Sequence, residues 1–326
     1  MDRSPHLSRG VMTSILLALA ACYNPTITTG VPCNELSACP VGQACVAGVC
    51  GGLAVGVDAA VEVDAAPASD GPSGSIVDRD GDGVADAVDN CPDVANPDQG
   101  NEDGDKFGDA CDPCPIEASD TPSDPDGDGV AGICDPHPTT PGDHLMLFEG
   151  FHRGIPSSWQ VVGTASPSGD DAVVTTVAGN HTALIAPITA IANGTITAAV
   201  TIDATLGNAD AAMTVVMPYD PTSDQGIFCE LYAPNAGSAS GHYVSLWDSP
   251  AQSERDRRNF AWTAATPCRV ALTRKGTGYT CTVTPNGGTA QTTSATTSSN
   301  PAQARASVAS YGANAHVAWV LVVSSP

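Results

Sequence analysis

Apolar and polar residues alternate in short stretches from about Leu145 to the C-terminus, which is the pattern of β-strands with one buried face. Turn signals at 178–180, 192–194 and 285–288 separate these stretches, and no amphipathic helical window competes with them. We predict strands at 159–162, 172–177, 195–202, 211–217, 227–232, 242–247, 269–273, 279–283, 305–309 and 317–323. So many short strands within residues 144–326 predict a mainly β fold, an antiparallel β-sandwich that can fold on its own.

The rest of the chain lacks this alternation and divides by composition into four segments. Residues 1–22 combine a positive start with an apolar run, and residues 23–50 hold four closely spaced cysteines. Residues 51–77 consist largely of Gly, Ala, Val, Asp, Ser and Pro without periodicity, as in flexible linkers. Residues 78–135 are strongly acidic. We therefore expect a leader, a small cysteine-rich module, a linker, an acidic segment and the sandwich, in that order.

Charge and cysteine content narrow the classes of function. The 326 residues carry 36 acidic against 12 basic side chains, a net charge of −24. So acidic a chain is repelled by phosphate backbones, which excludes nucleic-acid binding as its main function. Its 12 cysteines do not cluster with histidines as metal ligands do, so they indicate an oxidising compartment. No stretch is apolar over the roughly 20 residues that a membrane-spanning helix needs.

The acidic segment has the spacing of calcium-binding loops. It holds 18 of the 36 acidic side chains, against only Arg79 and Lys106. In a calcium loop, side chains at positions 1, 3, 5, 9 and 12 and the backbone carbonyl at position 7 surround the ion, and Gly at position 6 allows the tight turn. The predicted Ca²⁺ ligands are Asp78, Asp80, Asp82, Val84, Asp86 and Asp89 in the first loop, Asn101, Asp103, Asp105, Phe107, Asp109 and Asp112 in the second, and Asp124, Asp126, Asp128, Val130 and Asp135 in the third.

These loops and the residues between them resemble thrombospondin type 3 repeats. The resemblance covers 78–135 and rests on the motifs Asp78 to Gly83, Asp89-Asn90-Cys91-Pro92, Asn96-Pro97-Asp98-Gln99 and Gly108-Asp109-Ala110-Cys111-Asp112. Repeats of that family lack a conventional hydrophobic core, wrap around calcium ions and are tied by disulfides. The resemblance therefore implies the bridges Cys91–Cys111 and Cys114–Cys134.

Departures from the pattern predict unequal sites. Asn101 gives the second loop a neutral first ligand, and Lys106 replaces Gly at position 6, which we expect to place a cation near the ion. Gly132 stands where the third loop would have Asp at position 9. The first loop is therefore expected to bind most tightly, and Lys106→Gly to tighten the second. Because no loop has Glu at position 12, we expect dissociation constants of about 10⁻⁴ to 10⁻³ M.

Residues 1–22 read as an export signal, with Arg3 and Arg9 before an apolar run. The run ends in Leu19-Ala20-Ala21-Cys22, which resembles the bacterial lipoprotein signal. That resemblance implies lipidation of Cys22, membrane lipid as a partner, and an exported protein anchored at the outer membrane or cell surface. The alternative is an ordinary secretory signal that is cleaved after the two alanines.

Seven further cysteines leave alternatives open. Cys33, Cys39, Cys45 and Cys50 allow three pairings, of which we favour Cys33–Cys45 with Cys39–Cys50. Cys229, Cys268 and Cys281 share the parity of the apolar residues around them, so all three should face inward. Either Cys229–Cys281 or Cys268–Cys281 can form, and one buried thiol is left over.

The predicted sandwich resembles concanavalin A-like jelly rolls of the laminin G type. The resemblance rests on its length, its strand count, Phe148-Glu149-Gly150-Phe151 near its start and the strand at 317–323 at its end. Retaining sugar hydrolases on this fold place paired carboxylates on one strand, and the acids of this half lack that spacing. Gly-x-Ser-x-Gly is also absent from it, so we expect no catalytic residues and no enzyme.

Two features of the sandwich fit ligand binding. Six of its aromatic residues either stack on sugars or fill the core: Trp159, Trp247, Trp262, Tyr219, Tyr232 and Tyr243. The run of Arg255, Arg257 and Arg258 either holds an anionic glycan or is a solvated loop. The sequence thus predicts a calcium-binding, lipid-anchored surface protein that mediates adhesion or binds a carbohydrate or protein ligand through its sandwich. The alternatives are a divergent polysaccharide-degrading jelly roll and a purely architectural spacer.

Overall fold

The computed structural model describes residues 44–46, 49–51, 77–176, 180–189, 191–205, 210–233, 242–259, 262–299, 301 and 305–326. The chain divides into two compact units, Met1–Ser73 and Gly74–Pro326. In the first unit, the described part is a small antiparallel hairpin of β1 (Ala44–Val46) and β2 (Val49–Gly51). Several predictions lie outside the described residues: the export signal with Cys22, the pairings Cys33–Cys45 and Cys39–Cys50, and residues 52–76 of the predicted linker at 51–77.

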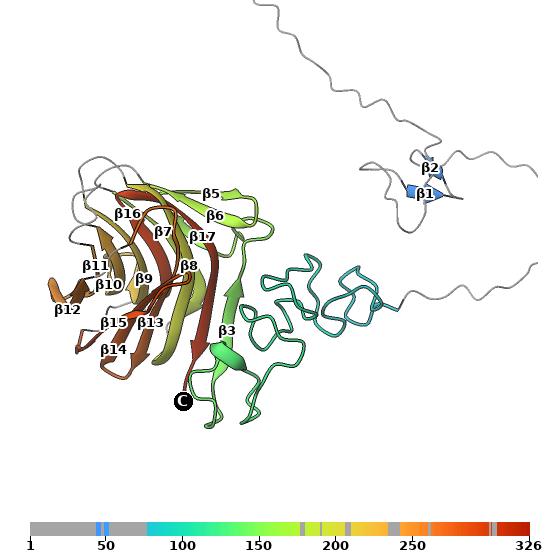
Figure 1. The fold of residues 1–326 in the computed structure, drawn as a ribbon, viewed down its shortest axis with the longest axis horizontal. Coiled ribbons are helices and arrows are strands. Elements are labelled where there is room, and N and C mark those ends of the chain that lie inside the picture. Colours follow the sequence, from blue (N-terminus) through green and yellow to red (C-terminus); the bar gives the residue numbers. More distant parts are fainter. Residues whose placement is uncertain are drawn as a thin grey trace, which may run out of the picture. The chain divides into compact units, whose positions relative to one another are not determined.

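The second unit contains two antiparallel sheets packed face to face (Figure 1). One has seven strands in the order β12-β11-β10-β9-β16-β7-β4, and the other has eight, in the order β15-β14-β13-β8-β17-β6-β5 with β3 also paired to β17. The strands are β3 (His144–Glu149), β4 (Gln160–Val162), β5 (Thr164–Ser168), β6 (Asp171–Thr175), β7 (His181–Thr189), β8 (Asn193–Thr205), β9 (Ala211–Asp220), β10 (Gln225–Ala233), β11 (Tyr243–Asp248), β12 (Ser253–Asn259), β13 (Pro267–Lys275), β14 (Gly278–Pro285), β15 (Gln291–Thr296), β16 (Arg305–Tyr311) and β17 (Ala313–Ser324).

The predicted mainly β class and the two-sheet antiparallel sandwich are confirmed, and each of the ten predicted strands is present. The pairing of Leu321 on the last strand with Phe148 on β3 brings the two ends of the sandwich together. In the described residues the only helical turn is the 3₁₀ helix Gly132–Cys134. None of their helices has the length and apolar character needed to cross a membrane.

Strands that the alternation did not predict have particular positions in the sheets. β12 and β15 are edge strands, and β12 is made of charged and polar residues from Ser253 to Asn259. Charge on an edge strand discourages pairing with another chain, so such a strand needs no apolar alternation. β7 lacks the alternation of apolar and polar residues for the opposite reason, because all residues from Thr182 to Ala186 are buried. A strand covered on both faces has no polar side to alternate with.

The main core lies between the two sheets. Met213 and Leu231 from the seven-stranded sheet and Ile196 and Leu272 from the eight-stranded sheet are almost completely buried there. One disulfide crosses this core, because Cys229 lies on β10 and Cys281 on β14. The pairing left open by the sequence is therefore Cys229–Cys281. Cys268 is the buried free thiol, and burial raises its pKa to about 11.

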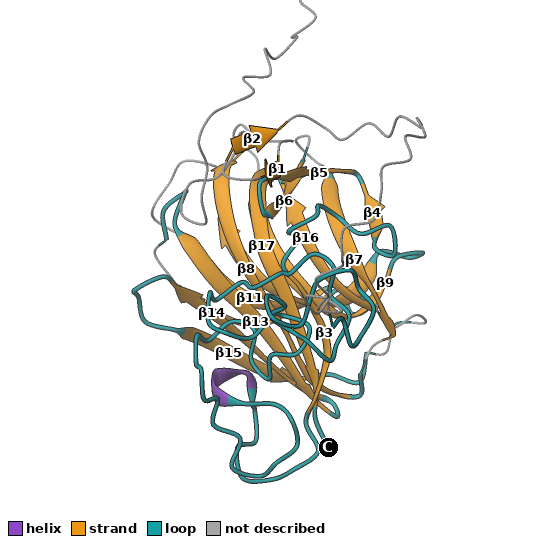
Figure 2. Ribbon diagram, turned by 90° about the vertical axis from the view of Figure 1, so that its right-hand side faces the viewer, coloured by secondary structure: helices purple, strands orange, loops and turns teal. Residues whose placement is uncertain are grey.

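A second apolar cluster joins the acidic segment to the outer face of the eight-stranded sheet. Val130 and the disulfide Cys114–Cys134 pack on Trp319, Leu321 and Val323 of β17. Figure 2 shows the loops of this segment lying across the side of the sandwich that carries β3 and β17. The segment thus gains from the sandwich an apolar surface that its own sequence cannot supply.

Removing the disulfide between the sheets should destabilise the sandwich. Cys229 and Cys281 are 52 residues apart, and closing a loop of that length in the unfolded chain is worth about 4 kcal/mol in the chain-entropy model. We expect Cys229→Ala with Cys281→Ala to lower the free energy of unfolding by about 2 to 4 kcal/mol in oxidising denaturant titrations. Cys268→Ala, which removes a buried but unpaired sulfur, should cost clearly less. Equal losses for the two would contradict a crosslink between the sheets.

Candidate functional sites

Each of the three predicted loops gathers carboxylates into a cluster. In each loop, three carboxylate oxygens from different aspartates lie within 4.8 Å of one another. The clusters are Asp78, Asp80 and Asp82 in the first loop, Asp103, Asp105 and Asp112 in the second, and Asp124, Asp126 and Asp128 in the third. Like charges this close repel one another unless a cation or protons compensate them.

The same turn opens every loop, and its glycine is at position 4. Gly81, Gly104 and Gly127 have φ values of 78°, 76° and 77°, a left-handed conformation that favours glycine. Each donates its N–H to the position-1 side chain, at 2.8 Å for Asp78, 2.7 Å for Asn101 and 2.8 Å for Asp124. Position 6, where the calcium-loop pattern has glycine, holds Lys106 in the second loop. Position 4 is therefore the glycine position that all three loops share.

The position-5 aspartate ties each loop to the chain that follows it. One carboxylate oxygen accepts the N–H two residues further on. The other accepts an N–H 14 residues further on: Asn96 to Asp82 and Ser119 to Asp105, both at 2.8 Å, and Gly142 to Asp128 at 2.9 Å. Successive loops are therefore cross-connected by side chains that also belong to the clusters.

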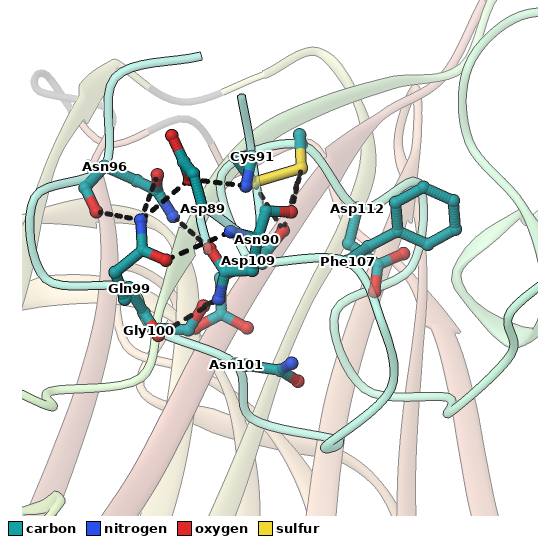
Figure 3. The surroundings of a disulfide bond; sticks show 12 residues. Asp89, Asn90, Cys91, Asn96, Gln99, Gly100, Asn101, Phe107, Asp109 and Asp112 are labelled. Carbon is teal, nitrogen blue, oxygen red and sulfur yellow. Dashed lines mark hydrogen bonds between the residues drawn. A yellow bond between two sulfur atoms is a disulfide. The ribbon is translucent and has the colours of Figure 1, made fainter. Parts of the chain in front are cut away.

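The motif residues between the first two loops hold Asp89 in place (Figure 3). One oxygen of Asp89 accepts the N–H of Cys91 and the side-chain amide of Gln99, both at 2.8 Å. Asn96 and Gln99 in turn hydrogen-bond Asn90. The disulfide Cys91–Cys111 closes the same region. The two bridges that the repeat resemblance implied are thus both present in the structure.

Positions 3 and 12 carry buried carboxylate oxygens without hydrogen-bond partners. Of the ten buried side-chain nitrogen and oxygen atoms that lack a partner in the described residues, seven belong to these positions. The residues are Asp80, Asp103 and Asp126 at position 3 and Asp89, Asp112 and Asp135 at position 12. Asp112 and Asp135 are only 6% and 8% exposed. Burial raises the pKa of Asp112 to about 6, which reflects the cost of leaving its charge without a partner.

The structure does not bring Asp86 or Asp109, the predicted position-9 ligands, into the clusters. Asp86 accepts the backbone N–H of Arg79 at 2.9 Å and pairs with its guanidinium at 2.8 Å. Asp109 accepts the N–H of Glu102 at 2.8 Å and lies 3.0 Å from Nε2 of His152. Both aspartates fix the backbone at the start of their loop, so position 9 has a structural role in these two loops.

The second loop differs from the others through a coupled pair. In the first loop, the second oxygen of Asp78 accepts the N–H of Gly83, and Gly83 has a φ of 96°. Asn101 has an amide nitrogen there, which cannot accept, and it donates to the Asp105 carbonyl at 2.7 Å.

Lys106 at position 6 therefore has other partners. Its N–H turns to Asp120 at 3.2 Å, and it is not among the described residues with positive φ. Its ammonium donates to the Asp120 carbonyl and lies 4.6 Å from the centre of the Phe107 ring. Lys106 is thus engaged by Asp120 and Phe107, contacts that the sequence did not predict.

A separate groove lies on the outer face of the seven-stranded sheet. It encloses about 730 Å³. Register places the residues of this part of the sheet in three rows across the strands. One row holds Tyr311, Ala212, Tyr232 and Tyr243, the middle row holds Ala309, Thr214, Glu230 and Ser245, and the third holds Val216, Phe228, Trp247 and Glu254. Polar and small side chains thus run between two rows that contain aromatic rings.

Of the six aromatic residues singled out in the sequence, four line this groove: Trp247, Tyr219, Tyr232 and Tyr243. Trp159 and Trp262 belong to the core between the sheets, as the alternative interpretation expected. Phe228 and Tyr311, which the sequence analysis did not select, also line the groove. Only the sheet register could identify them, because they are far apart in the chain.

The arginine run is a strand whose charges are paired. Arg255 contacts the buried Asp248 at 2.6 Å, and Arg258 approaches Asp256 at 3.7 Å. Arg257 lies 3.7 Å from Glu254 and covers the Tyr243 ring at 4.8 Å. The run is therefore neither a solvated loop nor an unpaired basic site for an anionic glycan.

No family model matches the chain, and no curated protein matches it either. Among solved structures, the basic winged bean lectin with Tn-antigen is 10% identical with a TM-score of 0.47, over 57% of this chain and 100% of the lectin. The metal-free exoplasmic/lumenal domain of VIP36 is 10% identical with a TM-score of 0.45, over 56% of this chain and 94% of that domain. The CBM2 module of the evolved Dit of Lactobacillus casei BL23 phage J-1 is 11% identical with a TM-score of 0.43, over 56% and 95%. Scores this low assign neither a ligand nor an ancestry.

Glu230 should make the stability of the sandwich depend on pH. Burial raises the pKa of its carboxyl from 4.5 to about 7, although the Ser245 hydroxyl donates to it at 2.7 Å. Below pH 4.5 the group is protonated in both the folded and the unfolded chain. Between pH 4.5 and about 7 the unfolded chain ionises this carboxyl while the folded protein keeps it protonated, so the folded state loses stability across this interval, and the full loss persists at higher pH.

Glu230→Gln should therefore raise the melting temperature at pH 8 and leave it nearly unchanged at pH 4, as measured by thermal unfolding. Ser245→Ala, which removes the donor to the charged form, should instead steepen the loss of stability toward high pH. Parallel pH profiles for the parent and Glu230→Gln would contradict a perturbed carboxyl.

Proposed function

We propose that the acidic segment binds three calcium ions, one in each loop. The observation that carries this proposal is the recurrence of buried, unpartnered carboxylate oxygens at positions 3 and 12 of every loop. A polar atom that is buried without a partner is costly, and a charged one more so. Calcium takes six to eight oxygen ligands and so fits such a set.

The ligand sets follow from the clusters and the unpartnered oxygens. Position 7 contributes its backbone carbonyl, as in other calcium loops, and position 9 is left out. The sets are Asp78, Asp80, Asp82, Val84 and Asp89 for the first site, Asn101, Asp103, Asp105, Phe107 and Asp112 for the second, and Asp124, Asp126, Asp128, Val130 and Asp135 for the third.

Calcium at these sites would fix the segment on the sandwich. Val130 offers its carbonyl to the third site, while its side chain is 1% exposed and packs in the cluster with Leu321. Binding of the ion and packing of the Val130 side chain on the sheet are therefore linked. At a dissociation constant of about 0.3 mM and about 1 mM calcium, each site would stabilise the folded segment by roughly 0.9 kcal/mol.

Within this proposal, the protein is an exported, lipid-anchored component of the cell surface or outer membrane, with Cys22 as the anchor. The sandwich provides adhesion or ligand binding without catalysis, and the calcium-bound segment holds it in a defined orientation. The described part of the sandwich supports binding by presenting the groove on the sheet opposite the one that the acidic segment covers.

Titration calorimetry with a matched pair of variants tests the calcium sites. The parent should bind three calcium ions. Asp89→Asn should lose the first site, because its buried oxygen would become an amide nitrogen or a neutral oxygen. Asp86→Asn removes a carboxylate of the same loop that pairs with Arg79 and lies outside the cluster, so this variant should still bind three ions. Loss of a site in Asp86→Asn, or three sites in Asp89→Asn, would overturn the ligand sets.

The second loop gives a prediction about coupled residues. Because the Lys106 ammonium already has partners at Asp120 and Phe107, Lys106→Gly alone should change the calcium affinity of that site by less than about threefold. Asn101→Asp together with Lys106→Gly recreates the acceptor and the left-handed turn of the first loop. We expect the double variant to bind about tenfold more tightly, a gain of about 1.4 kcal/mol. A large gain from Lys106→Gly alone would restore the view of this lysine as a defect.

A further inference from the structure

The groove on the seven-stranded sheet is a trough formed by small side chains beside large ones. Ala212, Thr214 and Ala309 on its central strands are small, whereas Tyr232 and Trp247 on the neighbouring strands are large. Side chains two residues apart on one strand are separated by roughly 6.7 Å, so the first and third rows stand about 13 Å apart. Small residues beside tall ones leave a trough that crosses β9, β10 and β11.

The two rims of the trough present aromatic rings, and its floor presents hydrogen-bonding groups. Tyr232 and Tyr243 stack with their centres 4.7 Å apart, which gives one rim a rigid double ring. Phe228 and Trp247 are cross-strand partners on the other rim. Between them, the middle row places the hydroxyl of Thr214 and the carboxyl of Glu230 side by side on paired positions. Flat apolar rims around a polar floor suit a ligand that has apolar faces and hydroxyl edges.

The charges around the trough select against anions. Asp210, Asp224, Glu230 and Glu254 line it, and Arg257, which lies over the Tyr243 ring, is paired with Glu254 at 3.7 Å. Asp224 accepts the Tyr219 hydroxyl at 2.8 Å and lies 3.6 Å from His181. The floor therefore offers mainly acceptors, which match the hydroxyl donors of a neutral sugar and repel carboxylate or sulfate groups.

We propose that this trough binds a linear, uncharged oligosaccharide. Sugar rings would stack their C–H faces on Trp247 and Tyr232 and donate hydroxyls to Glu230. The cavity of about 730 Å³ lies within the range of roughly 300 to 1,000 Å³ that is usual for small-molecule sites. The inference rests on the ligand-binding role proposed for the sandwich and names its ligand class; it does not depend on calcium binding, because the acidic segment packs on the other sheet.

Calorimetry of the full-length protein with cello-, xylo-, manno- and laminarihexaose tests this site, with oligogalacturonate as the anionic probe. At least one neutral hexasaccharide should bind with a dissociation constant below about 1 mM, and oligogalacturonate should not. Trp247→Ala and Tyr232→Ala should each weaken binding at least tenfold. Trp247→Phe, which keeps an aromatic face and controls for folding, should retain most of it. Thermal unfolding checks that every variant remains folded.

Three results would overturn the proposal. They are no binding of any neutral hexasaccharide at 1 mM, unchanged affinity in both folded alanine variants, or equal binding of oligogalacturonate. Asp89→Asn, which alters the first calcium loop, should bind the hexasaccharide as the parent does. The calcium proposal can therefore fail without affecting this test, and this proposal can fail while calcium binding stands.

Discussion

Buried carboxylates without partners are the constraint on which the acidic segment depends. Aspartates at positions 3 and 12 of each loop point oxygens into a space where no N–H or hydroxyl of the described residues reaches them. Backbone N–H groups hold the other oxygens in place, at Cys91, Cys114 and His137 for position 12. Burying these charges without partners is unfavourable by itself, and a divalent cation at each cluster would make the electrostatic free energy of the arrangement favourable. Under the calcium proposal, the folding of this segment and the binding of its ions would therefore be one process.

The sandwich supplies what the segment lacks. A chain with so few apolar residues cannot bury enough surface to fold alone, yet Val130, Cys114 and Cys134 are buried because Trp319 and Leu321 cover them. Trp319 is held in its turn, since Arg269 lies 5.5 Å above its ring and Phe148 packs beside it. The outer face of the eight-stranded sheet therefore acts as a second core, shared by the two parts.

The two faces of the sandwich consequently have different roles. The eight-stranded sheet is covered by the acidic segment, and the seven-stranded sheet keeps an open trough with aromatic rims. The disulfide Cys229–Cys281 links the two sheets directly. Cys229 lies between Phe228 and Glu230, which both face the trough, so the floor of the candidate ligand site is anchored to the opposite sheet. Rigid support of this kind suits a binding surface, because fewer groups must be ordered when a ligand arrives.

The features that depend on local spacing could be predicted from the amino-acid sequence alone. Alternation of apolar and polar residues located the ten strands. The spacing Asp-x-Asp-x-Asp in the first and third loops, and Asn-x-Asp-x-Asp in the second, located the three clusters. Resemblance to a known repeat gave the two disulfides of the acidic segment. These features could be read because each is set by residues that are close in the chain.

The other features required the folded structure, because they depend on which residues far apart in the chain come into contact. Asp86 and Asp89 look alike in sequence, but Arg79 engages the first while the second keeps a buried, unpartnered oxygen. The choice of Cys229 over Cys268 as the partner of Cys281 required β10 to face β14 across the core. Whether an aromatic ring lines a groove or fills the core was likewise settled by strand order and register. Residue spacing determines which side chains lie on one face of a strand or loop, and tertiary packing determines which other residues those side chains contact.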